Sequence, residues 1–551
     1  MRAATNRENF TGASRGRSNL PVSLSMVAER RIEALVALTA IASHASSLGA
    51  GFVWLDHAHI EEGLALARPG AWAALFAHGF AGTGFYRPLM SASLSLDAAF
   101  GGAPWLYHAT SSAWHAAAAV MTVVAAGALG IPRRAAATAG VLFAVHPVTS
   151  LVSNAIAFRS EAMIATMLLA LVALHRRGHR WGAGAALLAA GLTKETGVVL
   201  GPLFVLALEW ASPNEDRRES GARVRLWATE AGAWAAVLAL RYAFAPSWRA
   251  GFAPLAFSDA VGTRLASLAK SAARLVVPIE ATICDSFPVS PLFGLRALSG
   301  AVVLAGLAYL ALRRRGPALL LFLSILPSLQ LVPVMRWWSP HYLYVPLAFA
   351  AMLVAQALDL RSKGAVRWAV LGASLLAAMS FVEGLRYRSD ESLWAPEVAA
   401  DPTCREAHFY LAESAREARQ WDEAASRYEH ALASSPATLS YVDQLSTLQN
   451  LGVVRLEQHK PSEALVAFRA ALGVAGDDEQ RRRLTHNLAT AELSTGNAQE
   501  AARLLAPEVV RTDALPASML VRARALATLG EREQAAALIE RLKATRGAPQ
   551  E

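Results

Sequence analysis

The first 383 residues alternate apolar runs with short polar turns, whereas the residues after them have the pattern of a soluble helical protein. A helix needs ~20 mainly apolar residues to cross a bilayer. The pattern therefore predicts an all-α protein in two parts, a polytopic membrane bundle over 32–383 and a soluble α-solenoid over 405–547. About eleven runs approach or reach the spanning length: 32–54, 109–130, 135–151, 159–175, 181–193, 196–211, 226–245, 296–313, 317–334, 341–358 and 366–383.

Arginine-rich turns give the predicted orientation. Connections that carry Lys and Arg stay on the cytoplasmic side, and every second connection here is rich in these residues. The basic segment 1–31 belongs to this set, and the first apolar run has no small-residue cleavage site, so it is expected to be retained as a span. The set comprises Arg133-Arg134, Arg176-Arg177 with Arg180, Arg217-Arg218 with Arg223 and Arg225, Arg313-Arg314-Arg315, and Arg361 with Lys363.

The other face is then periplasmic. It is predicted to hold two long loops, 55–108 and 246–295, and everything after the last span. An odd number of spans places a linker, 384–404, and the solenoid on this face too. The expected localisation is the inner membrane of a bacterium, with the N-terminus in the cytoplasm.

The soluble part repeats one short phrase, which starts at Gln420, Lys460, Asn497 and Glu531 and ends four residues later in Ala. The starts are 40, 37 and 34 residues apart, near the 34-residue period of tetratricopeptide repeats. Four helical hairpins are therefore predicted over 405–547, and the alternative is a generic Ala-rich bundle. A stacked array of this kind has a concave groove suited to an extended peptide. Charged runs such as Arg481-Arg482-Arg483 are expected to form a solvated helix face.

Composition narrows the class of protein. With 54% hydrophobic residues and a mean hydropathy of +0.31, the chain is too apolar for an ordinary soluble protein. Its formal net charge is +9, but the arginines lie between apolar runs, so nucleic acid is not an expected partner. Only two cysteines are present, Cys284 and Cys404. A bridge between them is possible because both are expected on one face, although two separate thiols are favoured.

Polar residues without a topological role gather at the periplasmic ends of the spans. Ionisable groups at membrane depth cost roughly 2.5–3.5 kcal/mol each, so they mark functional sites. Cations that bind a phosphate, beside a carboxylate that removes a proton, suit group transfer from an anionic leaving group. The sequence contains no P-loop and no H-E-x-x-H helix. The residues are Asp56 and His57, Arg87, His146, Arg159 with Glu161, Lys194-Glu195, and His341 with Tyr342 and Tyr344.

Simpler interpretations stay open for several of them. Lys194 and Glu195 could be an internal ion pair at a helix break. Arg87 could bind lipid headgroups at the interface, and His146 could cap a helix before Pro147.

The motifs around these residues resemble the GT-C superfamily of polytopic glycosyltransferases, in particular the transmembrane and tetratricopeptide-repeat O-mannosyltransferases and their bacterial relatives. The similar segments are Phe52 to His57, Tyr86-Arg87-Pro88-Leu89, His146-Pro147-Val148 through Glu161, Thr193-Lys194-Glu195, Ala281 to Pro288, and Tyr342 to Pro346. The resemblance runs from about residue 32 to residue 547.

The chain departs from the family pattern at three positions. Leu55-Asp56 stands where the family usually has two adjacent acids, Ser150-Leu151 where it has Thr-Glu, and His341 where it has Arg.

The resemblance implies a catalytic carboxylate and a set of substrate-binding residues. Asp56 would be the catalytic base. The polyprenyl-phosphate sugar donor would contact Arg87, His146, Arg159, Glu161, Lys194, Glu195, His341 and Tyr344. No metal ligands and no separate cofactor are implied, because the lipid-linked sugar is a co-substrate.

The leading hypothesis is therefore a glycosyltransferase that moves mannose or a similar hexose onto a protein Ser or Thr, or onto a glycan, at the periplasmic face. An alternative is a catalytically inactive, membrane-anchored repeat scaffold that recruits envelope proteins. A lipid or sugar transporter is disfavoured, because the polar residues crowd one face instead of lining a path through the midplane.

Overall fold

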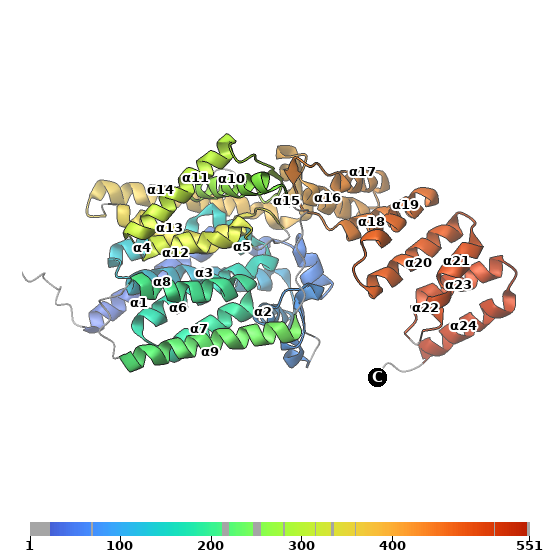
Figure 1. Ribbon diagram of the computed structural model, residues 1–551, viewed down its shortest axis with the longest axis horizontal. Helices are drawn as coiled ribbons and strands as arrows, with labels where there is room; N and C mark the ends of the chain where they lie inside the picture. The colour runs from blue at the N-terminus through green and yellow to red at the C-terminus, as the bar shows by residue number, and fades with distance from the viewer. Residues whose placement is uncertain are drawn as a thin grey trace, which may run out of the picture.

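The computed structural model describes residues 22–67, 70–211, 220–245, 255–278, 282–314, 316–331, 336–358, 360–511 and 513–547. These residues are almost wholly helical, and two short strands, β1 (Phe287–Pro288) and β2 (Thr438–Leu439), pair antiparallel. The predicted all-α fold is confirmed: Figure 1 shows a helical body and a solenoid that leads away from it. Arg217, Arg218 and Arg315, which helped to assign the faces, lie outside the described residues, as does Ala281.

Each of the eleven predicted runs contains a helix. In chain order they are α1 (Val22–Ser43), α3 (Pro104–Ala128), α4 (Arg133–Val145), α6 (Arg159–Arg177), α7 (Arg180–Thr193), α8 (Glu195–Ala211), α9 (Ser220–Phe244), α11 (Leu295–Arg314), α12 (Pro317–Ile325), α13 (Tyr344–Ala357) and α14 (Lys363–Gly384).

Shorter elements lie between these helices and after the last of them. They are the turns η1 (Ala45–Gly49), η2 (His57–Glu61), η3 (Trp72–Phe76), η4 (Phe80–Gly82), η5 (Pro147–Thr149), η6 (Ile156–Phe158), η7 (Leu326–Leu329), η8 (Pro340–Leu343) and η9 (Leu385–Arg388), and the helices α2 (Pro88–Ala99), α5 (Ser150–Asn154), α10 (Phe257–Val276) and α15 (Asp390–Ala400).

Several predicted spans differ in their ends, and two of them show a structural cause. The first was expected over 32–54, but α1 ends at Ser43, and the buried His44 after it meets the Thr149 hydroxyl, 3.1 Å from its Nε2. The run at 135–151 is broken at Pro147, where the helix axis bends by 53°. Proline has no N–H to continue the helix. In both cases a contact or a backbone constraint ends the helix before the apolar run ends.

The apolar helices indicate a membrane protein. Among the described residues, four helices are long and apolar enough to cross a bilayer by length and composition, and five if the bent pair Arg133–Val145 and Pro147–Asn154 is one span. In α14 only 6% of the apolar window is buried, and in α11 only 17%. Water does not stabilise so large an apolar surface, so lipid is its natural environment.

The solenoid consists of the four predicted hairpins. They are α16 (Arg405–Glu417) with α17 (Trp421–Leu432), α18 (Gln444–Glu457) with α19 (Pro461–Val474), α20 (Asp478–Ser494) with α21 (Ala498–Leu504), and α23 (Pro516–Thr528) with α24 (Arg532–Gly547); the short α22 (Ala506–Val509) precedes the last.

The recurring phrase has a conformational origin. The residue before each copy has a positive φ: 57° at Arg419, 59° at His459, and 86° at both Gly496 and Gly530. A left-handed residue after the last helical turn is the usual end of a helix, and glycine adopts it without strain. The phrase therefore marks where the first helix of each hairpin stops and the second begins.

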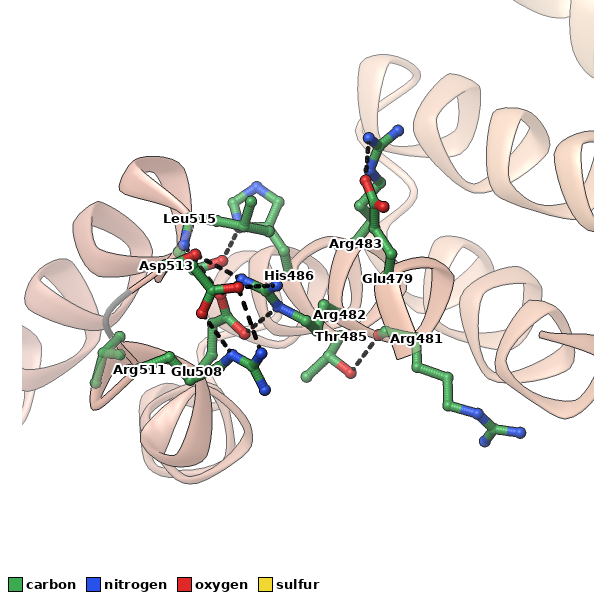
Figure 2. Close-up of polar contacts among 12 residues, drawn as sticks. Glu479, Arg481, Arg482, Arg483, Thr485, His486, Glu508, Arg511, Asp513 and Leu515 are labelled. Carbon is green, nitrogen blue, oxygen red and sulfur yellow. Dashed lines mark hydrogen bonds and ion pairs between the residues drawn. The ribbon is translucent and has the colours of Figure 1, made fainter. Parts of the chain in front are cut away.

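The expectation for Arg481-Arg482-Arg483 was wrong at its central residue. Figure 2 shows that Arg483 pairs with Glu479 of its own helix, whereas Arg482 points toward the neighbouring segment. The Arg482 guanidinium contacts the Glu508 carboxylate at 2.8 Å and Asp513 at 2.9 Å. Helical periodicity turns neighbouring residues to different faces, so one arginine of the three joins α20 to α22 and the loop after it.

The first hairpin is fastened to the body. Cys284 of the large loop that is predicted to be periplasmic forms a disulfide with Cys404, which corrects the expectation of two separate thiols. Beside the bridge, the Asp285 carboxylate accepts a hydrogen bond from the Tyr441 amide, 2.9 Å away, and β1 pairs with β2. Burial is the main cause that raises the pKa of Asp285 to about 8, and the nearby Glu406 carboxylate raises it as well. Long-range folding places these cysteines together, and their spacing of 120 residues gave no signal of it.

Candidate active site

Three of the predicted residues form one buried group. Glu161 lies in the first turn of α6, Lys194 lies in the break between α7 and α8, and His341 lies in η8. Lys194 Nζ forms an ion pair with the Glu161 carboxylate, and His341 Nε2 lies 3.7 Å from the same carboxylate. A buried charge persists only when it is paired, so this group holds three separate segments at one level.

Arg87 and Glu195 form a second ion pair. The Arg87 guanidinium lies 2.8 Å from a Glu195 oxygen and 4.2 Å from the centre of the Phe85 ring. Glu195 also accepts a hydrogen bond from the Tyr86 amide at 2.9 Å. Because Lys194 and Glu195 are adjacent in sequence yet pair with different partners, the simple interpretation of a Lys194–Glu195 internal pair is wrong.

Asp56 is fully buried at the start of the first loop that is predicted to be periplasmic. One carboxylate oxygen accepts a hydrogen bond from the Ala157 amide at 2.7 Å, and the other accepts longer bonds from the Ile156 and Val53 amides. Burial raises the pKa of Asp56 to about 7, and these amide hydrogen bonds oppose the shift. The carboxyl group therefore titrates in the range that a general base requires at neutral pH.

Trp54, two residues earlier, is held in a strained conformation. Its φ is 58°, which is rare for a bulky residue. Its amide donates to Asp390 at 2.8 Å, and its indole N–H donates to Glu406 at 2.7 Å. The linker acid Asp390 therefore holds the backbone just before Asp56, and Glu406 of the first repeat holds the Trp54 side chain.

His57 adds a second titratable group beside Asp56. Its Nε2 lies 2.8 Å from Asp390, and its Nδ1 contacts Glu61. The hydrogen bond to Asp390 is the main cause that raises the pKa of His57 to about 9. Burial lowers this pKa, and the contact with Glu61 raises it further. The imidazole is therefore protonated at neutral pH and places a positive charge next to the Asp56 carboxylate.

Three predicted site residues lie in the surrounding packing instead of the two ion-paired groups. Arg159 is fully buried and pairs with Asp97 at 2.7 Å. The His146 Nδ1 accepts a hydrogen bond from the Val148 amide at 3.2 Å, as its alternative interpretation as a helix cap predicted. The Tyr344 hydroxyl meets His115 Nδ1 at 2.7 Å inside the helical core.

Arg336 is a site residue that the sequence prediction missed. It is buried in the loop before His341, and its guanidinium pairs with Glu406 of α16, with Nε 3.1 Å from the carboxylate. It also lies over the Trp54 ring, 5.0 Å from its centre. The one signal in the sequence was the position of Arg336. It lies on the predicted periplasmic face, where the positive-inside pattern does not call for an arginine.

A small cavity adjoins this region. It encloses about 20 Å³, which is space for about one water, and its lining includes Ser150, Trp338 and Tyr387. The Ser150 and Tyr387 hydroxyls have no hydrogen-bond partner within the part of the chain that is described. The cavity lies directly behind the segments that carry His146 and His341.

Comparison with known proteins extends the sequence analysis. No family model matches the chain. The protein O-mannosyl-transferase Tmtc2 of Drosophila melanogaster is 31% identical over 186 residues, which cover 30% of this chain and 20% of that protein. The match supports the resemblance to the O-mannosyltransferases, and the chain spans about a fifth of the relative's length.

Two solved structures match the chain at low similarity. ArnT from Cupriavidus metallidurans, solved bound to undecaprenyl phosphate, is 15% identical, with a TM-score of 0.39, over 89% of this chain and 81% of that one. A kinesin light chain from Podosopora anserina with tetratricopeptide-like repeats is 21% identical, with a TM-score of 0.25, over 33% of this chain and 89% of that one.

Proposed function

We propose that this protein is a membrane glycosyltransferase that transfers a sugar, mannose or a similar hexose, from a polyprenyl-phosphate carrier to a protein Ser or Thr or to a glycan. The observation that carries the proposal is the group of two ion pairs, the partly buried Arg87 with Glu195 and the buried Lys194 with Glu161. Each cation already has a carboxylate partner, and a phosphate oxygen of the donor can take that partner's place.

The reaction is a single displacement. The acceptor hydroxyl oxygen bonds to the anomeric carbon as the bond from that carbon to the phosphate oxygen breaks, and the hydroxyl proton passes to Asp56. Arg87 and Lys194 stabilise the negative charge on the departing polyprenyl phosphate. The walls of the proposed active site are held in place by three positioning residues, Arg159, His146 and Tyr344. No separate cofactor takes part.

The solenoid contributes by binding the acceptor. Its first hairpin supplies Glu406, which contacts both Trp54 and Arg336. Removal of the whole array would therefore disturb the site itself. Removal of residues 444–547 spares this hairpin, so it should raise the KM for a large acceptor and leave donor binding unchanged.

The decisive experiment is an assay of the full-length protein in lipid nanodiscs with radiolabelled polyprenyl-phosphate mannose. The wild type should transfer the sugar, and Asp56→Asn should lower kcat by about 10²–10⁴, the range for general-base catalysis. Since the base must be deprotonated, the wild-type rate should rise with pH through about 7 and then level off. Asp422→Asn, which changes an acid in the solenoid, is the matched control.

A scaffold without catalysis is the second candidate. The observation that favours it is that all three of the Asp56 carboxylate's hydrogen bonds come from backbone amides, which is the bonding of a structural acid. In that case Asp56→Asn changes stability but no transfer is seen with any donor, and Lys194→Met leaves polyprenyl-phosphate binding unchanged. Loss of that binding in Lys194→Met supports the enzyme.

The orientation has its own test. A periplasm-active reporter fused after Gly547 should be active, and one fused after Arg177 should be silent, because the first lies beyond the last span and the second in an Arg-rich turn. The reverse pattern would contradict the prediction that the solenoid lies on the periplasmic face.

A further inference from the structure

A groove at the opposite end of the membrane body has the features of a lipid site. It lies among α7, α8 and α9, has a volume of about 450 Å³, and is mostly apolar. Leu206 on its wall is 65% exposed, and two tryptophans, Trp227 and Trp234, are 40% and 37% exposed. These elements are among the predicted spans, so the groove opens toward the bilayer.

A proline and a tryptophan give the groove its shape. Pro202 lies inside α8 and has no N–H, so the Val198 carbonyl four residues earlier loses its helical donor. The Trp234 indole N–H of α9 donates to this carbonyl at 2.9 Å. On the other side, α9 packs closely on α7, where a Cβ on Gly191 would lie 2.8 Å from Val237. The indole therefore fixes the floor of the groove.

The other end of the groove is charged. His175 contacts two carboxylates, with Nδ1 2.7 Å from Glu230 and Nε2 3.0 Å from Glu209. Arg223 pairs with Glu209, and the Trp227 indole donates to the same carboxylate at 2.9 Å. Two carboxylates therefore face one arginine and one histidine at this end of the groove.

Two polar atoms at this end are left over. Within the described residues, Glu230 Oε2 and Arg223 Nε have no hydrogen-bond partner, and both residues line the groove. Glu230 is 2% exposed. An unpartnered buried acceptor and an unpartnered donor are costly unless a ligand satisfies both.

We propose that this groove binds a phospholipid with a primary ammonium head, of the phosphatidylethanolamine type. Its phosphate accepts from Arg223, its ammonium donates to Glu230 Oε2, and one acyl chain lies along Leu206 and Trp234. A choline head has no N–H to donate, and a purely anionic head meets the Glu230 carboxylate. The site lies beside Arg176-Arg177, at the end away from Asp56, so it does not depend on the proposed function.

The first test keeps the protein unchanged. Native mass spectrometry of the purified full-length chain should be run with phosphatidylethanolamine and with its mono-, di- and trimethylated forms. Retention should fall along the series, by about tenfold from the primary to the quaternary amine, the loss expected for one hydrogen bond to a charged group. Equal retention of all four lipids overturns the proposal.

Variants locate the site. Glu230→Gln should abolish the preference for the primary amine, and Arg223→Gln should weaken retention of every phospholipid by about tenfold. Arg314→Gln, an exposed arginine at the end of α11 on the same predicted face, is the matched control and should behave as the wild type. If Glu230→Gln keeps the full preference, the ammonium binds elsewhere and the assignment is wrong.

Discussion

Charged residues in the membrane body and in the solenoid are paired in opposite ways. In the body, Arg159 and Asp97 come from different helices, and their side chains are 0% and 5% exposed. In the solenoid, Arg483 and Glu479 are one turn apart on one helix, and theirs are 66% and 69% exposed. Water solvates the second pair whether or not it forms, whereas the first pair is shielded from water and its two charges must compensate each other. An ion pair between arginine and a carboxylate therefore has a structural role in the membrane body and contributes little to the structure of the solenoid.

The sharpest way to break this comparison is a matched pair of substitutions. Arg159→Met should leave Asp97 as an unpaired buried charge and lower the free energy of unfolding by about 3–5 kcal/mol. Arg483→Met should change it by less than about 0.5 kcal/mol. Denaturant unfolding in detergent micelles measures both, and similar losses in the two variants would contradict the comparison.

The disulfide tests how far the two regions act as one. Cys404→Ser removes a link that closes a long loop, which typically costs about 2–4 kcal/mol. The stability of the first hairpin should fall by this amount, as followed by limited proteolysis and thermal unfolding. A reducing agent should reproduce the loss in the wild type and have no effect on the variant; a wild type insensitive to reduction would show that the bridge carries no stability.

The smallest expected effect is in the solenoid turns. His459→Gly should raise the stability of the array by about 0.5–1 kcal/mol, because glycine relieves the left-handed strain at a φ of 59° but orders less readily. Gly496→Ala, at the equivalent turn, should lower it by about 1 kcal/mol. Thermal unfolding of the two variants checks the sign of each change in stability. A loss of stability in His459→Gly would mean that the imidazole stabilises the array by more than the strained turn destabilises it.

Local patterns predicted the fold well and the site in part. Every apolar run contains a helix because hydrophobic periodicity is a property of neighbouring residues. The grouping of Glu161, Lys194 and His341 also followed, since all three lie at span ends on one face. The end of α1 did not follow, because it depends on the contact of His44 with Thr149. Arg336 and Glu406 are 70 residues apart and meet only when the solenoid docks, which no local pattern records.

The fixed first hairpin has a consequence for what the array does. A hairpin held by a disulfide, a strand pair and a buried ion pair cannot swing relative to the helical body. The later hairpins extend from it at a set spacing, so each lies at its own constant distance from that body. The array therefore holds whatever it binds at a fixed distance from the helical body. Adding or deleting one hairpin would change that distance by the length of one repeat.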